Sequence, residues 1–161
     1  MAEPASNSTP PAPPLGIFNA KVDDKGRLKL PAEFVEYLRQ LNVGEVFITT
    51  LDEKQARIYS KTVWLSNLQF LETVTEAAAD AADVAFLADV YGGVSGIDLQ
   101  GRVLVPSELR KLLEIEGETV WLRYYKSHIK FFGKKVFDER LQRSRHGAED
   151  KLAGLEKQGF K

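Results

Sequence analysis

Two almost matching stretches decide how this sequence is expected to fold: VDDKGRLKLP at residues 22–31 and IDLQGRVLVP at residues 97–106. Each contains an Asp, two variable residues, Gly-Arg, an apolar–variable–apolar triplet and a Pro. The offset between the copies is 75 residues here and shortens to 73 residues further along the chain. That period is too long for a solenoid, so the sequence predicts an internally duplicated domain with a pseudo-twofold axis.

Each stretch predicts a β-hairpin that is closed by a tight turn. Gly26 and Gly101 suit a turn with positive φ, where the Cβ of another residue would clash. Asp23 and Asp98 open the turns, and an Asp in this place is typical of a side chain that caps the turn backbone. The flanking strands are expected at residues 18–22 and 27–30, and at residues 94–97 and 102–105.

The rest of each copy predicts a helix, two strands and a further helix, which makes the fold class α+β. Pro31 and Pro106 fit the first position of a helix, where a missing N–H has no cost, and apolar residues follow at helical spacing. Six aromatic residues at apolar strand or helix-start positions are expected in the core or at a subunit interface: Phe47, Trp64, Trp121, Phe131, Phe132 and Phe137.

The repeat also predicts the domain boundaries. Residues 1–14 contain five prolines and little apolar side chain, which predicts a disordered tail. The first copy with its trailing helices is expected over residues 15–90, and the second copy over residues 91–145. Residues 146–161 are expected to be a polar tail or a helix end.

The arginine of each turn allows two interpretations. Arg27 and Arg102 could pair with the Asp of their own turn and only rigidify it. Because the sequence is duplicated, a pseudo-twofold would place both arginines on one face, where their guanidinium groups suit phosphate or guanine. A hairpin or two-stranded ribbon can enter the major groove of DNA. This second interpretation is favoured.

The positions beside the two arginines make the copies unequal. Lys25 and Lys29 in the first copy would add contacts with DNA phosphates. The second copy has Gln100 and Leu104 in these places. Its contribution to binding is therefore expected to be less electrostatic.

The sequence contains no motif that favours an enzyme. Its histidines, His128 and His146, have no Cys or second His at ligand spacing, so no metal site is expected. A P-loop, a dinucleotide fingerprint and a nucleophile elbow are all missing. The chain is therefore expected to be neither an enzyme nor a cofactor-binding protein.

The composition limits the partners of the chain. Its 161 residues carry a net charge of −1 and no Cys, which fits a reducing cytoplasm. No signal peptide or membrane span is expected. The charge is uneven, since residues 72–89 carry five acidic residues and no basic one, whereas residues 123–161 carry eleven basic and five acidic residues. Nucleic acid would therefore bind through a local cluster or through sites repeated in an oligomer.

The two Asp-x-x-Gly-Arg units, each followed by an apolar–variable–apolar triplet and Pro, resemble the AbrB-like swapped-hairpin DNA-binding element. Two of them about 75 residues apart, each followed by a helix that starts with an aromatic residue, resemble the MraZ family of bacterial transcriptional regulators. The resemblance covers residues 15–141.

The resemblance implies that the halves interlock into a pseudo-symmetric β-barrel and that chains assemble into rings. Such a ring would bind direct repeats of double-stranded DNA in the promoter of a division and cell-wall gene cluster, in the cytoplasm and associated with the nucleoid. It implies that Arg27 and Arg102 contact the DNA, with Lys25 and Gln100 as neighbours in the same loops.

The sequence departs from the family pattern in two places, and the net charge of −1 together with the acidic helix favours an alternative function. Residues 77–89 are alanine-rich and acidic where the family has a basic helix, and the Pro-rich N-terminus is unusually long. The alternative is a protein-interaction or scaffolding module that is built on the same barrel and does not bind DNA strongly.

Overall fold

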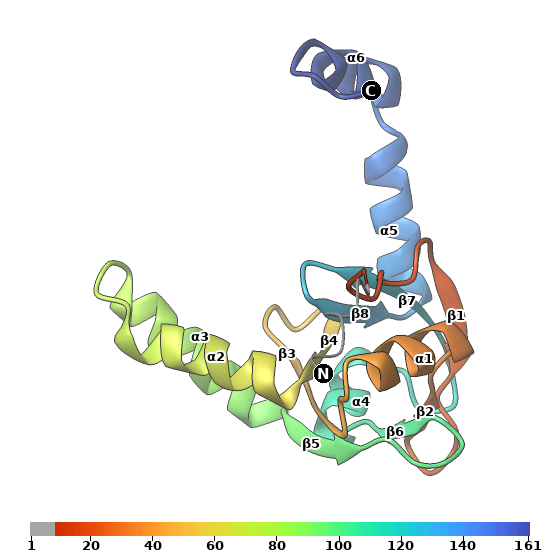
Figure 1. Cartoon of the computed structure of the whole chain (residues 1–161), viewed down its shortest axis with the longest axis vertical. Coiled ribbons are helices and arrows are strands. Elements are labelled where there is room, and N and C mark those ends of the chain that lie inside the picture. The colour runs from red at the N-terminus through yellow and green to blue at the C-terminus, as the bar shows by residue number, and fades with distance from the viewer. Residues whose placement is uncertain (1–8) are drawn as a thin grey trace, which may run out of the picture.

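The computed structural model describes residues 9–161, which form eight strands and six helices (Figure 1). The strands are β1 (Phe18–Lys21), β2 (Arg27–Lys29), β3 (Glu45–Thr50), β4 (Ala56–Ser60), β5 (Gly93–Gly96), β6 (Arg102–Leu104), β7 (Thr119–Tyr125) and β8 (His128–Phe132). The helices are α1 (Ala32–Gln40), α2 (Lys61–Thr73), α3 (Ala78–Tyr91), α4 (Ser107–Leu113), α5 (Lys134–Arg145) and α6 (Ala148–Lys157). Both halves therefore have the predicted order β-β-α-β-β-helix. Most of the predicted Pro-rich tail lies outside the described residues.

The first helix of each half begins directly after a proline. The carbonyl of Pro31 accepts a hydrogen bond from the backbone N–H of Val35 at 3.2 Å, and the carbonyl of Pro106 accepts one from Arg110 at 3.0 Å. Each proline is thus the cap of its helix rather than the first helical residue, one position earlier than predicted. A proline is tolerated there because the N–H that it lacks has no partner within the helix.

The strands of the two halves are exchanged. The order of the six-stranded sheet is β1-β7-β8-β4-β3-β5, so β1 of the first half pairs with β7 of the second, and β5 of the second half pairs with β3 of the first. The remaining strands, β2 and β6, pair with each other as a two-stranded ribbon. Neither half completes a sheet without the other.

The strand registers define a pseudo-twofold axis. In the ribbon the central pair is Leu28 opposite Val103, which are equivalent residues of the two copies. On the other side of the molecule β4 pairs with β8, and the central pair there is Arg57 opposite Lys130, which are again equivalent residues. The axis passes through both central pairs, so the ribbon and the β4–β8 pair lie at opposite ends of it.

One apolar core lies between the ribbon and the inner face of the sheet. Leu28 and Leu30 are 0% and 2% exposed, so they face the core as their alternation predicts. Phe34 from α1 and Phe131 from β8 are the largest side chains that are fully buried there. Burial of a side chain of this size stabilises a fold by about 1.5–3 kcal/mol relative to exposure.

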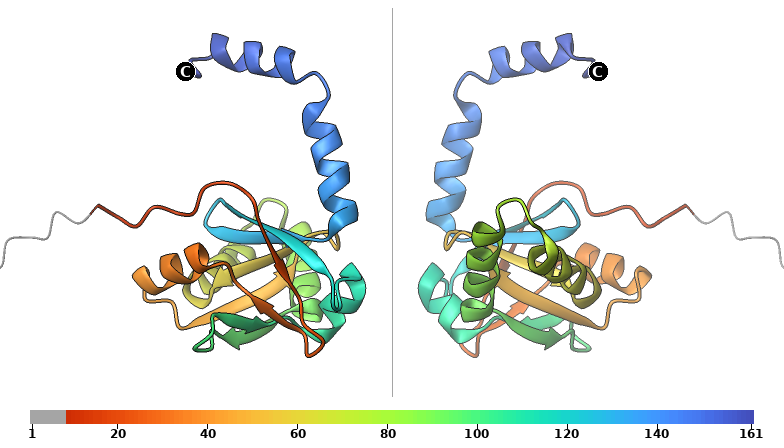
Figure 2. Two further views of the ribbon diagram at one scale, coloured as in Figure 1. Left: turned by 90° about the vertical axis from the view of Figure 1, so that its right-hand side faces the viewer. Right: turned by 90° about the vertical axis from the view of Figure 1, so that its left-hand side faces the viewer.

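The outer face of the sheet is covered unevenly. Helices α2 and α3 form a hairpin that packs on β3 and β4, and Trp64, Tyr59 and Ala88 are buried beneath it. Helix α5 rises away from the body and α6 turns off at its far end (Figures 1 and 2). Of the predicted aromatic core residues, Trp64, Phe131 and Phe132 are buried, and Phe47, Trp121 and Phe137 are partly buried.

The predicted closed β-barrel is not found. In the described residues the sheet and the ribbon are separate ladders, and an isolated bridge between Val22 and Leu28 joins them at the first turn. The ribbon strands have three residues each, and beyond the Val22–Leu28 bridge no described ladder joins them to the sheet. Within residues 9–161, no helix is both long and apolar enough to cross a membrane.

Candidate nucleic-acid interface

The β2–β6 ribbon brings both predicted arginines to one surface. Arg27 lies opposite Leu104, and Lys29 lies opposite Arg102. Side chains alternate along a strand, and the central pair of the ribbon points into the core, so these four side chains point outward. The outer face therefore carries three cations and one leucine that is 54% exposed. Lys29 and Arg102 are like charges directly opposite each other, so their repulsion destabilises the pairing of β2 with β6.

The first turn holds its arginine with one carboxylate. Asp23 Oδ1 accepts hydrogen bonds from the backbone N–H groups of Lys25 and Arg27 at 2.9 and 2.8 Å, and Oδ2 accepts one from Arg27 Nε at 2.8 Å. Gly26 has φ +82°, in the region that favours glycine. The Asp thus caps the turn and orients the guanidinium at the same time.

The second turn repeats this geometry. Asp98 Oδ1 accepts from the backbone N–H groups of Gln100 and Arg102 at 2.9 and 2.8 Å, and Oδ2 accepts from Arg102 Nε at 2.7 Å. Gly101 has φ +76°. The two guanidinium groups are therefore held by matching sets of bonds at pseudo-symmetric positions.

The carboxylates stay ionised at neutral pH. The backbone N–H of Arg27 holds the pKa of Asp23 below its usual value, and the Arg27 side chain adds to this effect. Arg102 lowers the pKa of Asp98 in the same two ways. Each pair is partly exposed, so it contributes little to stability. Among the described residues, each arginine uses Nε in its turn and no bond is formed by its terminal Nη groups.

The neighbours of the arginines differ between the turns. Lys25 and Gln100 bond through their backbone N–H groups, and their residues are exposed. Lys29 is also exposed. At the tip of the second turn Leu99 is fully exposed, whereas the first turn has Asp24 in this place. The first turn thus presents more charge and the second turn more apolar surface.

A third arginine near the ribbon is not singled out by the sequence. Arg110 on α4 donates to the carbonyl of Val105 and lies 3.6 Å from Glu116, and its side chain is 15% exposed. A Cβ on Gly26 would overlap its guanidinium. The equivalent residue behind Gly101 is Val35. An alignment of the two copies sets Val35 against Arg110, but their positions behind the turns only become visible in the fold.

A pair of cations at the other end of the axis is also not singled out by the sequence. Arg57 and Lys130 face each other across β4 and β8 on the outer side of the sheet. Burial lowers the pKa of Lys130, and Arg57 lowers it further. Because these two residues occupy equivalent positions in the repeat, the alignment of the copies contained a signal for them.

The described residues contain no group of three or more His, Asp or Glu side chains that could hold a metal ion. His128 is 5% exposed and its Nε2 has no partner among them. Burial lowers the pKa of His128 to about 4, so the ring is neutral at physiological pH. Its ring packs against that of Tyr59, with 4.8 Å between the ring centroids, so His128 contributes to the packing of the fold.

Fold and site together define a class: an internally duplicated α+β protein with exchanged strands and twin Gly-Arg turns on one basic ribbon. No protein-family model matches the sequence. The chain is 31% identical over 138 residues to the transcriptional regulator MraZ of Acidobacterium capsulatum, which covers 86% of this chain and 94% of that protein. It is 32% identical over 129 residues to the transcriptional regulator MraZ of Caldanaerobacter subterraneus subsp. tengcongensis, with 78% and 84% covered. The chain belongs to the MraZ family of transcriptional regulators.

Proposed function

We propose that this regulator binds double-stranded DNA in a sequence-specific manner through the outer face of the β2–β6 ribbon, without catalysis or a cofactor. One observation carries the proposal: the register that sets Arg27 opposite Leu104 and Lys29 opposite Arg102 puts both turn arginines on one exposed surface. Three cations on a two-stranded ribbon match a negatively charged groove that is wide enough for such a ribbon.

The turns give each side chain a separate task. Asp23 and Asp98 fix the guanidinium groups through Nε, which leaves Nη donors for guanine O6 and N7 or for phosphate. Lys25 and Lys29 contact phosphates of the backbone. Gln100 is suited to the donor and acceptor pair of adenine.

Several copies that bind together are needed for strong binding. A ribbon of two three-residue strands touches few base pairs, so a single copy binds weakly. Several copies in a ring, each an AbrB-like swapped-hairpin unit, bind successive direct repeats and multiply these weak contacts. The family resemblance favours a promoter of the division and cell-wall gene cluster as the target, and the nucleoid as the place of action.

Selection of binding sites from random double-stranded DNA, combined with a mass measurement of the free protein, tests this proposal. We expect enrichment of a short sequence in direct repeats, and a mass that is a multiple of the 18.0 kDa chain. Binding should also weaken steeply between low and moderate salt. If no sequence is enriched and no binding occurs at low salt, the proposal is wrong, and a protein-interaction module that recruits its partner through the acidic α2–α3 hairpin takes its place.

A further inference from the structure

In the first half, α3 fills a place on the outer face of the sheet. Its Ala88 is fully buried against Tyr59 and Trp64, and the Ala88 carbonyl accepts a hydrogen bond from Thr49 Oγ1 at 2.7 Å. Four partly buried residues complete this cluster: Phe47, Leu51, Val63 and Leu71. The α3 helix follows α2 in the chain and folds back along it.

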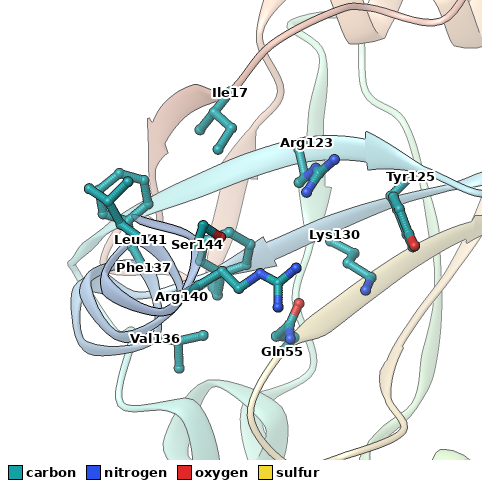
Figure 3. A pocket seen from close by; sticks show the side chains of 11 residues that line it. Ile17, Gln55, Arg123, Tyr125, Lys130, Val136, Phe137, Arg140, Leu141 and Ser144 are labelled. Atoms are coloured by element: carbon teal, nitrogen blue, oxygen red, sulfur yellow. The ribbon is translucent and has the colours of Figure 1, made fainter. Parts of the chain in front are cut away.

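The second half has an equivalent site on the outer face of the sheet, but none of the described helices covers it. The strand registers make Trp121 and Phe137 the counterparts of Phe47 and Trp64, and both pairs stack with 4.8 Å between ring centroids. The counterparts of Leu51, Tyr59, Val63 and Leu71 are Tyr125, Phe132, Val136 and Ser144. These last four residues and Phe137 line a cavity of about 250 Å³ (Figure 3). The cavity is therefore the counterpart of the place that α3 occupies.

The helix that could have filled this cavity points away from it. By its position in the chain α6 corresponds to α3, because it follows α5 as α3 follows α2. Gly147, with φ +64°, turns the chain sharply, and Lys151 Nζ donates to the carbonyl of Arg143 at 3.0 Å across the bend. The two helices form an elbow instead of a hairpin, so α6 lies far from the body (Figure 2).

The α6 helix lacks packing of its own. All ten of its residues are exposed, including Leu152 at 46% and Leu155 at 51%. A helix shorter than about 12–15 residues is marginal in water unless one face packs against another element. Within residues 9–161 no buried residue of α6 packs on another element, so a stable α6 needs a surface on which to dock.

The cavity and α6 have opposite charges. Arg123, Lys130 and Arg140 line the cavity, and none of them forms a salt bridge with a described carboxylate. Arg123 occupies the position of Thr49, which is buried beneath α3 in the first half. On α6, Glu149 and Glu156 stand three residues before and four residues after Leu152, so they share its face.

We propose that α6 of a second copy docks in this cavity, with its leucines on the aromatic wall and its two glutamates on the cavity cations. The contact rests on the proposed function only in that copies assemble, and it needs no DNA. Each copy donates α6 and receives α6 at different places, so the contact is head-to-tail. A heterologous contact of this kind closes into a ring or continues as a filament.

The 161-residue chain has no Cys, so introduced thiols can report on the contact. Gln55 lines the cavity beside Arg140 (Figure 3). Gln55→Cys protein is mixed with Leu152→Cys protein that carries a tag, treated with a short bis-maleimide, and separated on a denaturing gel. The matched control replaces Leu152→Cys by Leu41→Cys, since Leu41 has a similar exposure of 44% at the end of α1. The chain that carries both Gln55→Cys and Leu152→Cys is treated in the same way.

We expect a cross-linked heterodimer from the Gln55→Cys and Leu152→Cys mixture and none above background from the control. A single-chain cross-link in the double variant, without heterodimer from the mixture, means that α6 enters its own cavity and overturns the proposal. The absence of any cross-link overturns it as well. DNA binding by these variants is measured in parallel, so failure of the helix contact is distinguished from failure of the DNA-binding function.

Discussion

Thr49 in the first half is fully buried beneath α3, whereas Arg123, at the equivalent place in the second half, lines an open cavity. The strands beneath them have the same register and partners related by the pseudo-twofold. In the described part of the chain, the large difference between these two places is whether a helix returns to the sheet. Strand exchange therefore constrains the backbone of both copies, and the outer surface of each copy is free to acquire its own chemistry.

The same contrast applies to the turns. Their backbone hydrogen bonds agree closely, yet Arg110 stands behind the first turn and Val35 behind the second. The turn geometry that the two copies share is thus compatible with a charged or an apolar side chain packed behind the turn. Variants that exchange residues between the halves test whether the outer surfaces are independent of the shared backbone.

The largest effect is expected from exchanging the two outer residues. Thr49→Arg would bury an unpaired charge beneath α3 and should lower the free energy of unfolding by at least about 3 kcal/mol. The reciprocal Arg123→Thr should change it far less, by about 0.5 kcal/mol within one copy, because Arg123 lines an open cavity and is only partly buried. Urea unfolding of both variants at one protein concentration gives the comparison. Equal losses would contradict the different covering of the two halves.

The glycines of the turns should respond differently to alanine. Gly101→Ala is expected to cost about 2–3 kcal/mol, because it combines a positive φ with overpacking. Its Cβ would lie 2.7 Å from Val35 Cγ2, and a β-branched side chain has few alternative rotamers. Gly26→Ala meets only the end of the Arg110 side chain and should cost less. Val35→Ala should recover part of the Gly101→Ala loss in thermal unfolding, and no recovery would show that backbone strain alone is responsible.

His128 should make the stability of the protein sensitive to acid. Burial lowers its pKa to about 4, whereas an unfolded chain titrates near 6.5. Between these values the unfolded state binds a proton that the folded state does not, so stability falls as the pH falls. From pH 7 to pH 5 the free energy of unfolding should decrease by about 2 kcal/mol through this residue.

The first half has Gln55 at the position equivalent to His128, which supplies a matched substitution. His128→Gln should reduce the stability difference between pH 7 and pH 5 in urea unfolding. His146→Gln, at an exposed position, is the control and should leave the difference unchanged. An unaltered pH dependence in His128→Gln would assign the effect to other groups.

The smallest effect concerns the salt dependence of DNA binding. Lys25 and Lys29 make the first turn the more basic, so Arg27→Ala should reduce the slope of log affinity against log salt concentration more than Arg102→Ala does. Each phosphate contact contributes about 0.9 to this slope. Fluorescence anisotropy over a salt series measures it. Equal reductions would mean that the extra lysines do not set the electrostatics of their turn.

The repeated stretch predicted much of the local structure because each element has a local cause. Gly26 and Gly101 need a positive φ, Pro31 and Pro106 cap helices, and the alternation around Leu28 separates core from surface. These signals lie within about ten residues of one another. The location of Arg27 and Arg102 on one face of the molecule was predicted from the duplication alone.

Features that depend on distant segments could not be predicted in this way. Thr49 and Arg123 both lie in strands whose side chains alternate between the two faces of the sheet. Only the path of α3 or α6 decides which of the two residues a helix covers. The barrel was expected from the resemblance, but in the described residues the ribbon and the sheet are separate ladders that only an isolated bridge joins. Arg57 and Lys130 were missed although the repeat aligns them, because their opposition appears only when β4 pairs with β8.

Binding of a selected DNA site by Arg27→Ala and Arg102→Ala tests the role of the β2–β6 ribbon. Arg39→Ala is the control, since Arg39 is an exposed arginine on α1 that pairs with Glu36. Loss of a bidentate arginine contact costs about 1–3 kcal/mol, so each turn variant should bind roughly 5-fold to 150-fold more weakly at constant salt. Arg39→Ala should bind like the unmodified chain, and all three variants should keep its thermal stability. Unchanged affinity in both turn variants would contradict the role of the β2–β6 ribbon in binding DNA.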